Sequence, residues 1–172
     1  DLFSAEHFAA HLRVFPEGQH IALLNDVVVG ESSTFRISGE RVFAYHTFSE
    51  IIGHGYFTEH EPQGDWLYGA DMSVHPGYRR LGVARALYDA RKELIRRLGL
   101  RGMVAGGMLP GYPRYRDPMS VEAYVADGVA GRLADPTLTP QLRNGFQVRG
   151  VLRDHIHAGE LGSDAALIVW EA

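Results

Sequence analysis

One long segment of the chain alternates apolar and polar residues at the spacing of an α-helix, which predicts a helix over residues 83–98. Gly99 follows directly and is a typical residue for ending a helix. The apolar positions recur at steps of three and four: Val83, Leu87, Ala90, Leu94 and Leu98.

Three shorter helices are predicted by their start signals. Ser4 precedes a periodic segment that runs to residue 15, and Ser120 precedes a second one that runs to about residue 132. Asp135 and Pro136 begin a third helix, which Asn144 and Gly145 end. Residues 41–52 are ambiguous, and we expect a short strand there followed by a short helix near Ser49.

Short apolar runs separated by turn residues predict a set of strands. Asn25 and Asp26 lie between the first two runs and indicate a hairpin. The predicted strands cover residues 21–24, 27–37, 55–60, 66–74, 101–108, 146–152 and 166–170. Strands and helices mixed in this order predict one α/β domain, spanning residues 1–172, around a single mixed sheet.

Composition narrows the functional classes. Hydrophobic residues make up 45% of the chain and charged residues 22%, as in ordinary globular domains. The formal net charge of −4 argues against a general binder of nucleic acid or of anionic membranes. The absence of cysteine excludes disulfides, thiolate metal sites and a cysteine nucleophile, and it is compatible with the cytoplasm. No apolar run has the ~18 residues of a membrane span.

The loop before the long helix carries the most specific chemistry. Within residues 74–84, Gly82 and Ala84 leave room for an anion to approach the backbone at the start of a helix. Arg79 and Arg80 add positive charge beside it. These features predict a phosphate site, whereas the alternative is a tight turn with solvated arginines. The P-loop and dinucleotide-binding glycine patterns are absent.

The same eleven residues, VHPGYRRLGVA, resemble the V-x-P-x-x-[RQ]-x-x-G-x-[GA] signature of the GNAT superfamily, the Gcn5-related N-acetyltransferases. Residues 55–94, 104–115 and 135–146 are similar to the acetyltransferase module that is fused to carbon–nitrogen hydrolase domains in some bacterial proteins. The resemblance implies the GNAT fold, in which helices flank a mixed, mostly antiparallel sheet that splays between the strands before and after the long helix.

The resemblance also implies acetyl-CoA as co-substrate and no metal. Backbone groups of Met72 and Val74 would hold the pantetheine arm and polarise the thioester carbonyl. The loop would hold the pyrophosphate, with Arg79 in a supporting role and backbone donors among Arg80, Leu81, Gly82, Val83 and Ala84.

Acetyl transfer to an amine requires a base, because an alkylamine with a pKa near 10 is mostly protonated at neutral pH. Asp71 is the first candidate, since it lies on the strand just before the loop, and a structural carboxylate is the alternative. Glu59, His54 and His60 are rival candidates on the preceding segment.

The resemblance has one departure near the catalytic centre. Many relatives have a tyrosine five residues before the phenylalanine of a Gly-Phe pair, where it protonates the leaving thiolate, but this chain has Gln141. Tyr112 or Tyr115 could replace that acid, and unassisted departure of the thiolate is the alternative.

The sequence does not identify the molecule that accepts the acetyl group. Tyr124, Arg114 and Glu59 are candidate substrate contacts, and the arginine hints at an acceptor that bears a carboxylate or a phosphate. Small amines, protein N-termini and lysine side chains all suit the pattern. Homodimers are common among members of the resembled family, and the sequence leaves the oligomeric state open. A non-catalytic module that binds acyl-CoA is the main alternative, and a longer acyl donor is a weaker one.

Overall fold

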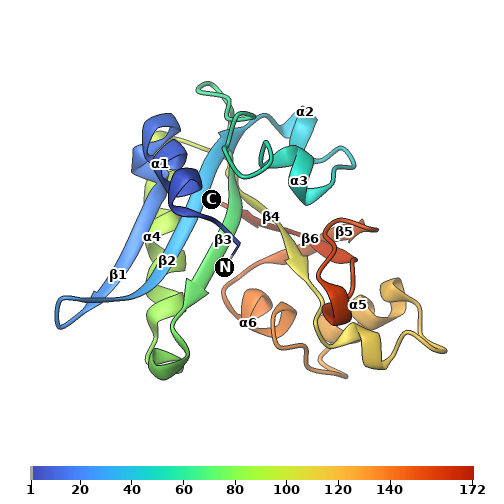
Figure 1. Cartoon of the computed structure of the whole chain (residues 1–172). Coiled ribbons are helices and arrows are strands. Elements are labelled where there is room, and N and C mark those ends of the chain that lie inside the picture. The colour runs from blue at the N-terminus through green and yellow to red at the C-terminus, as the bar shows by residue number, and fades with distance from the viewer. Residues whose placement is uncertain (1) are drawn as a thin grey trace. The chain divides into compact units, whose positions relative to one another are not determined.

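The computed structural model describes residues 2–172, and its strands form one sheet in the order β1-β2-β3-β4-β6-β5 (Figure 1). The pairings β1–β2, β2–β3 and β5–β6 are antiparallel. Strands β3 and β4 pair in parallel, through three residue pairs. The strands are β1 (Gln19–Leu24), β2 (Val27–Ile37), β3 (Trp66–Val74), β4 (Gly102–Met108), β5 (Gln147–Leu152) and β6 (Ala165–Glu171). This is the mixed, mostly antiparallel sheet that the resemblance implied.

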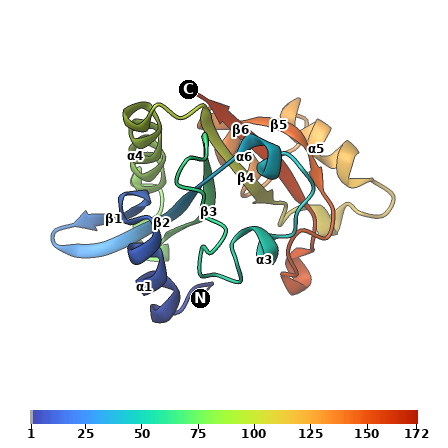
Figure 2. The same ribbon diagram turned by 90° about the horizontal axis from the view of Figure 1, so that it is seen from above.

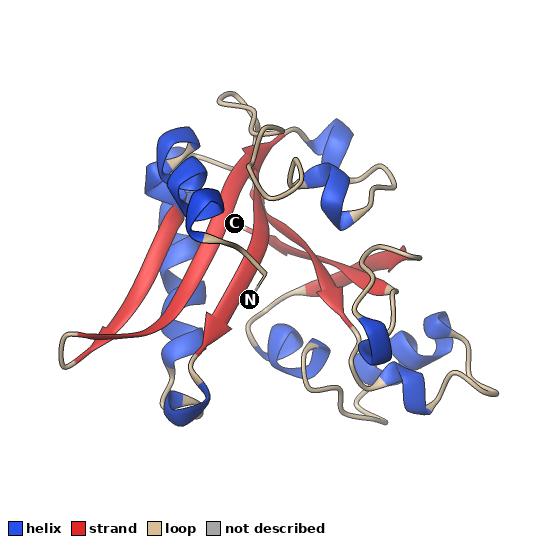
Figure 3. Cartoon of the chain, in the orientation of Figure 1, coloured by secondary structure: helices blue, strands red, loops and turns tan. Residues whose placement is uncertain are grey.

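The chain forms two compact units. Figure 3 shows the helices, strands and loops of the chain in separate colours. We call residues 2–44, 49–104 and 171–172 the N-terminal unit, and residues 45–48 and 105–170 the C-terminal unit. The boundary falls within β4, so both units contain part of that strand. No helix within residues 2–172 is long and apolar enough to cross a bilayer.

In the N-terminal unit, α4 (Val83–Leu98) covers one face of β1–β3 and α1 (Ala5–Val14) lies on the other (Figure 2). Gly30 of β2 allows close approach of α4, since an added Cβ there would lie 3.0 Å from Val83 Cγ1. On the opposite face, the rings of His11 and Phe57 stack at 3.6 Å, and Phe57 lies 4.9 Å from Phe35 of β2. Both faces of this half of the sheet are therefore packed.

The helix signals at Ser4 and Gly99 are confirmed. The Ser4 hydroxyl accepts from the N–H of His7, and the His7 ring accepts in return from the Ser4 N–H at 3.0 Å. Gly99 ends α4 with a φ of +66°, a conformation that residues with a Cβ avoid. The buried face of α1 is not simply apolar, because Phe8 and Leu12 are exposed whereas His11 is buried.

A β-bulge in β3 shifts the side chains that precede the predicted phosphate loop. Ser33 pairs with Asp71 and Thr34 pairs with Gly69, so Ala70 is an extra residue opposite β2. A bulge of this kind locally increases twist and redirects side chains, and bulges are frequent beside functional sites.

The C-terminal unit contains α5 (Val121–Val129), α6 (Leu138–Arg143) and the short helices η3 (Tyr112–Arg114) and η4 (Gly159–Leu161). The buried carboxylate of Asp135 connects α5, α6 and the start of η3. It accepts hydrogen bonds from the Tyr124 hydroxyl at 2.8 Å and from the N–H of Gly111 at 3.0 Å. It also accepts from the N–H groups of Thr137 and Leu138, which lie at the start of α6.

Several predicted boundaries were wrong. Residues 55–60 form consecutive turns instead of a strand, and His54 and Phe57 have positive φ values that no extended strand permits. Residues 41–52 contain the short helices α2 (Gly39–Val42) and α3 (Phe48–Ile51) and no strand. α5 ends at Val129, and α6 begins only at Leu138. Two remaining short helices are η1 (Pro16–Gly18) and η2 (Pro76–Tyr78).

Candidate functional site

Local hydrogen bonds fix the backbone conformation of the predicted phosphate loop. His75 Nδ1 accepts from the N–H of Gly77 at 3.1 Å, and the N–H of Tyr78 donates to the carbonyl of His75 at 2.9 Å. Arg80 and Gly82 follow with φ values of +64° and +82°. The turn η2 therefore leads into two left-handed residues, which reverse the chain directly at the start of α4.

The start of α4 presents backbone donors without partners in the helix. The N–H of Ala86 is the first that donates within the helix, to the carbonyl of Gly82 at 3.0 Å. The N–H groups of Gly82, Val83 and Ala84 precede it and carry the positive end of the helix dipole. A Cβ added to Gly82 would meet no atom within 4 Å, so an anion can reach these donors. This geometry suits a diphosphate.

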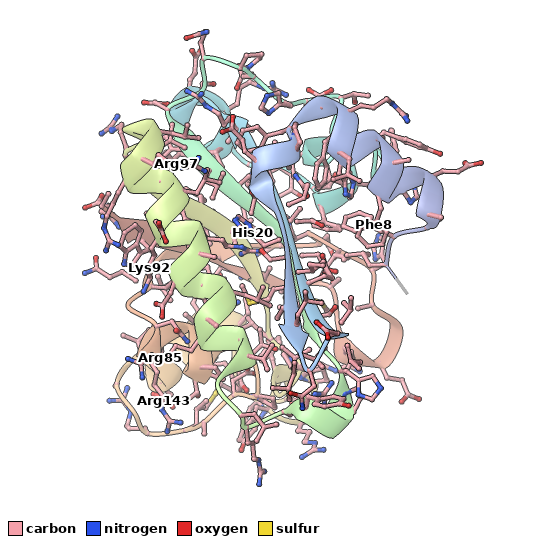
Figure 4. All side chains as sticks on the ribbon, turned by 90° about the vertical axis from the view of Figure 1, so that its left-hand side faces the viewer. Phe8, His20, Arg85, Lys92, Arg97 and Arg143 are labelled. Carbon is pink, nitrogen blue, oxygen red and sulfur yellow. The ribbon has the colours of Figure 1, made fainter. Side chains whose placement is uncertain are left out.

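Positive side chains surround this helix entrance. Arg79 and Arg80 are exposed, and within residues 2–172 neither forms an ion pair. Leu81 is 64% exposed. In Figure 4, Arg85 lies near the start of α4, whereas Lys92 and Arg97 lie farther along the helix. The predicted pyrophosphate residues Arg79 to Ala84 are therefore exposed, except Val83, which is half-buried.

Met72 and Val74 lie on β3 between the bulge and the loop. They pair with Ser32 and Gly30 of β2. The ladder between β3 and β4 ends at the pair Tyr68–Val104. Among the described residues, the β4-facing edge of β3 after Tyr68 therefore has no ladder partner, and its backbone groups are available to a ligand such as the pantetheine arm.

Asp71 has an acidic partner that the sequence did not reveal. The register of β2 on β3 places Glu31 on the same face as Asp71, and Glu31 Oε2 accepts from the Ser33 hydroxyl at 3.0 Å. Burial, followed by the neighbouring carboxyl group of Asp71, raises the pKa of Glu31 to about 7, whereas Ser33 and Arg91 act in the opposite direction.

Arg91 is a buried cation beneath this pair, on the α4 side of the sheet. Its Nε donates to the Ser32 hydroxyl at 2.6 Å, and its Nη2 donates to the backbone carbonyl of Asp71. Burial lowers its pKa, but a guanidinium remains charged in proteins. Because a trans peptide directs its C=O and N–H to opposite sides, this contact directs the N–H of Met72 away from Arg91.

The other candidate bases have structural partners. Glu59 forms an ion pair with Arg41. His54 Nδ1 lies 2.9 Å from the Ser49 hydroxyl, and His60 Nδ1 accepts from the N–H of Arg36 at 3.0 Å. His60 therefore helps to hold the turn segment against β2.

The remaining predicted residues belong to the C-terminal unit. The Tyr112 hydroxyl donates to the carbonyl of Met119 at 3.1 Å, whereas Arg114 and Tyr115 are exposed. Tyr124 is fully buried, and burial together with Asp135 raises its pKa far above the ordinary value. Tyr124 packs inside its unit, which leaves Arg114 and Tyr115 as the solvent-facing side chains of this set.

The C-terminal unit also contains a buried histidine. His155 is 1% exposed, its Nδ1 donates to the carbonyl of His46 at 3.0 Å, and its buried Nε2 has no partner. Burial lowers its pKa to about 4, so the ring is neutral at physiological pH. Gln141, at the position of the expected tyrosine, likewise has a buried amide oxygen without a partner.

Comparisons with known proteins agree with this geometry. The acetyltransferase (GNAT) family model matches residues 5–109. The Bacillus subtilis (strain 168) proteins "Probable hydrolase YhcX" and "Uncharacterized N-acetyltransferase YkwB" are 40% identical over 141 residues and 32% identical over 170 residues. These alignments cover 82% and 99% of this chain, but only 28% of YhcX and 75% of YkwB. The similarity to a probable hydrolase agrees with the expected resemblance to a fused module.

Solved structures show the same fold. The loading GNATL domain of CurA from Lyngbya majuscula has a TM-score of 0.83 at 21% identity, covering 98% of this chain and 83% of that one. The GphF GNAT-like decarboxylase, solved with isobutyryl-CoA, has a TM-score of 0.79 at 22% identity, covering 98% and 85%. Together with the family match over residues 5–109, these findings show that the chain belongs to the acetyltransferase (GNAT) family.

Proposed function

We propose that this chain transfers an acetyl group from acetyl-CoA to a primary amine by direct attack, with residues 1–172 acting as one catalytic domain. The observation that carries the proposal is the start of α4. There the N–H groups of Gly82, Val83 and Ala84 precede the first donor within the helix, the space around Gly82 is open, and two exposed arginines lie beside it. Such a site takes a diphosphate, which is the part of coenzyme A that the family's loop holds.

The strand before the loop orients the thioester in this proposal. With the diphosphate held at Gly82, the pantetheine arm extends along the unpaired edge of β3, past Val74 and Met72. The N–H of Met72, oriented through the contact of Arg91 with the Asp71 carbonyl, donates to the thioester oxygen as negative charge develops on it. Arg91 is thus a positioning residue in the mechanism.

Proton transfer starts at Asp71, next to Met72. An acceptor arrives mostly as its ammonium ion and loses one proton to this carboxylate. The neutral nitrogen then attacks the thioester carbon, the C–S bond breaks, and the second nitrogen proton leaves as the amide forms. Coenzyme A departs as a thiolate, whose ordinary pKa near 8.5 permits unassisted departure.

Of the two proposed acids we prefer Tyr115, because its side chain is 44% exposed whereas the Tyr112 hydroxyl donates to a backbone carbonyl. Arg114 is the proposed contact for an anionic group of the acceptor. Arg114→Ala should then raise the acceptor KM and leave the KM for acetyl-CoA unchanged. An unchanged acceptor KM would remove Arg114 from the proposal.

The test is time-dependent release of free thiol from acetyl-CoA in the presence of an amine panel that includes alkylamines, amino acids, polyamines and peptides with free N-termini. Amine-dependent release, together with an acetylated product in the mass spectrum, supports the proposal. Binding of coenzyme A without turnover across the panel supports the alternative, a module that binds acyl-CoA without catalysis.

One structural relative is described as a decarboxylase, so the same assay should include malonyl-CoA without an amine. Release of carbon dioxide there, in the absence of amine acetylation, would replace the proposed reaction by decarboxylation of an acyl-CoA.

A further inference from the structure

The helix α1 exposes an apolar face to solvent. Four of its residues recur at steps of three and four and therefore share one side of the helix: Ala5, Phe8, Ala9 and Leu12. We call these four residues the α1 stripe. All four are exposed, with Leu12 at 57%. A surface helix ordinarily turns such a stripe toward its own core, so the α1 stripe is an apolar surface that the chain itself leaves uncovered.

The opposite side of α1 already has its partners within the N-terminal unit. Ala10 and His11 are the buried residues of the helix. The ring of His11 stacks on Phe57, and its Nε2 lies 2.7 Å from the carbonyl oxygen of Gly55. Turning α1 so that the stripe became buried would break these contacts. The stripe therefore stays exposed in a single copy of the chain.

Two charged side chains flank the stripe. Glu6 and Arg13 are seven positions apart, which is close to two helical turns, so they lie on the same side of α1. Both are exposed, and within residues 2–172 neither forms an ion pair. Side chains pair along a helix at spacings of three and four, so these two do not neutralise each other. One flank of the stripe thus carries an acidic and a basic group, each without an ion-pair partner among the described residues.

A second copy of α1 that runs antiparallel to the first would match the stripe in shape. In a two-fold contact, each residue that meets a second residue is met by it in return. An axis close to Ala9 sets Phe8 of each copy against Ala9 of the other, and Leu12 against Ala5. Large side chains then face small ones along the whole stripe, which is the arrangement that lets two surfaces interdigitate.

The same axis also matches the charges. Glu6 of each copy faces Arg13 of the other, so two ion pairs form between groups that are unpaired in one copy. Charged residues that flank an apolar seam set the partner and the orientation of paired helices. A parallel arrangement would place each of the two groups against its own copy, and like charges would repel. The flanking charges therefore favour an antiparallel second copy.

We propose that this chain forms a two-fold dimer through the α1 stripe, with the two α1 helices antiparallel. The helix has 10 residues and is about 15 Å long. The contact is therefore smaller than a standard interface of about 800 Å² per partner, and the dimer should dissociate on dilution. The proposal is independent of the proposed function, because it uses no residue of β3 or α4.

Sedimentation velocity over a series of concentrations, from roughly 1 μM to 1 mM, tests the association. Wild type should change from monomer to dimer within this range. Leu12→Glu should raise the dimer Kd by roughly 30-fold or more, because the change acts twice in a two-fold contact. Leu23→Glu is the matched control, since Leu23 of β1 is 58% exposed, and it should associate as wild type does.

Exchange of the flanking charges tests the orientation. Glu6→Arg and Arg13→Glu should each weaken self-association, because each sets like charges against one another across the axis. An equimolar mixture of the two variants should form a mixed dimer, since one copy then carries two basic groups and the other two acidic groups on the facing flanks. A loss of helix stability would not be restored by mixing, so the recovery is specific to the antiparallel contact.

A wild type that stays monomeric at every concentration would overturn the proposal, and so would loss of association in Leu23→Glu. A mixture of the two charge variants that stays monomeric while wild type dimerises would exclude the antiparallel contact. The thermal transition of each variant checks that it is folded. If Leu12→Glu does not fold, the mixture of charge variants decides the question.

Discussion

Comparing Gly82→Ala with Gly99→Ala separates the effect of an added methyl group on diphosphate binding from its effect on backbone strain. Gly82 and Gly99 lie at opposite ends of α4, with φ values of +82° and +66°, and a Cβ on either would meet no atom within 4 Å. Alanine at each position therefore adds one methyl group in a left-handed conformation without a clash. Each variant should lose about 1–2 kcal/mol of stability for that reason.

Of the two added methyl groups, only the one at Gly82 would lie between an incoming anion and the first N–H groups of α4. Loss of one charge-assisted hydrogen bond costs about 1.5–3 kcal/mol, which corresponds to a rise in the Kd for coenzyme A of roughly 10- to 150-fold. Gly99→Ala, about 24 Å away along a helix of 16 residues with a rise of about 1.5 Å per residue, should leave that Kd unchanged.

Calorimetry with coenzyme A on both variants, each checked for folding by its thermal transition, is the assay. Equal loss of affinity in both variants would mean that binding responds to the stability of α4 instead of to its free N–H groups. No loss in Gly82→Ala would mean that the diphosphate lies elsewhere. Either result would refute the reasoning.

Three further predictions concern stability. The raised pKa of Glu31 means that the folded state binds more protons than the unfolded state between about pH 4.5 and 7. Stability should therefore fall by about 1–2 kcal/mol as the pH rises through this window, since solvent screens part of the effect at a partly exposed group; Glu31→Gln should flatten that fall and raise the Tm at pH 8. The lowered pKa of His155 acts in the opposite direction, so stability should be lost by up to about 3 kcal/mol as the pH falls from about 6.5 to 4, and His155→Gln should remove most of that loss in urea titrations. Tyr124→Phe should cost about 1–2 kcal/mol, because it removes a buried hydrogen bond to Asp135, and it should leave the acceptor KM unchanged in the thiol assay.

Local sequence rules predicted the elements whose signals are local. The hairpin turn at Asn25 and Asp26 was confirmed, with φ values of +49° and +64° that asparagine and aspartate tolerate. The helix 83–98 and the loop before it were also confirmed, since glycine at both ends and apolar residues at regular spacing leave few alternatives. The segment 55–60 was mistaken for a strand because its aromatic residues favour strands, whereas Gly55 and the preceding Gly53, with φ values of +95° and +57°, permit the turns that form.

Long-range pairing could not be deduced in the same way. Glu31 and Asp71 are 40 positions apart in the sequence, and only the register of β2 on β3 places them on one face. That register depends on the extra residue at Ala70, which no local sequence pattern predicted. No local pattern marks His155 as buried, and its burial follows from packing around His46. Burial and pairing of titratable groups are tertiary properties.

The most direct test of the central claim is an NMR titration of the backbone amides of Gly82, Val83 and Ala84. Addition of coenzyme A should shift these three resonances strongly, and addition of pantetheine, which lacks the diphosphate, should leave them in place. If coenzyme A binds while these amides do not move, or if pantetheine moves them equally, the start of α4 does not hold the diphosphate and the account is wrong.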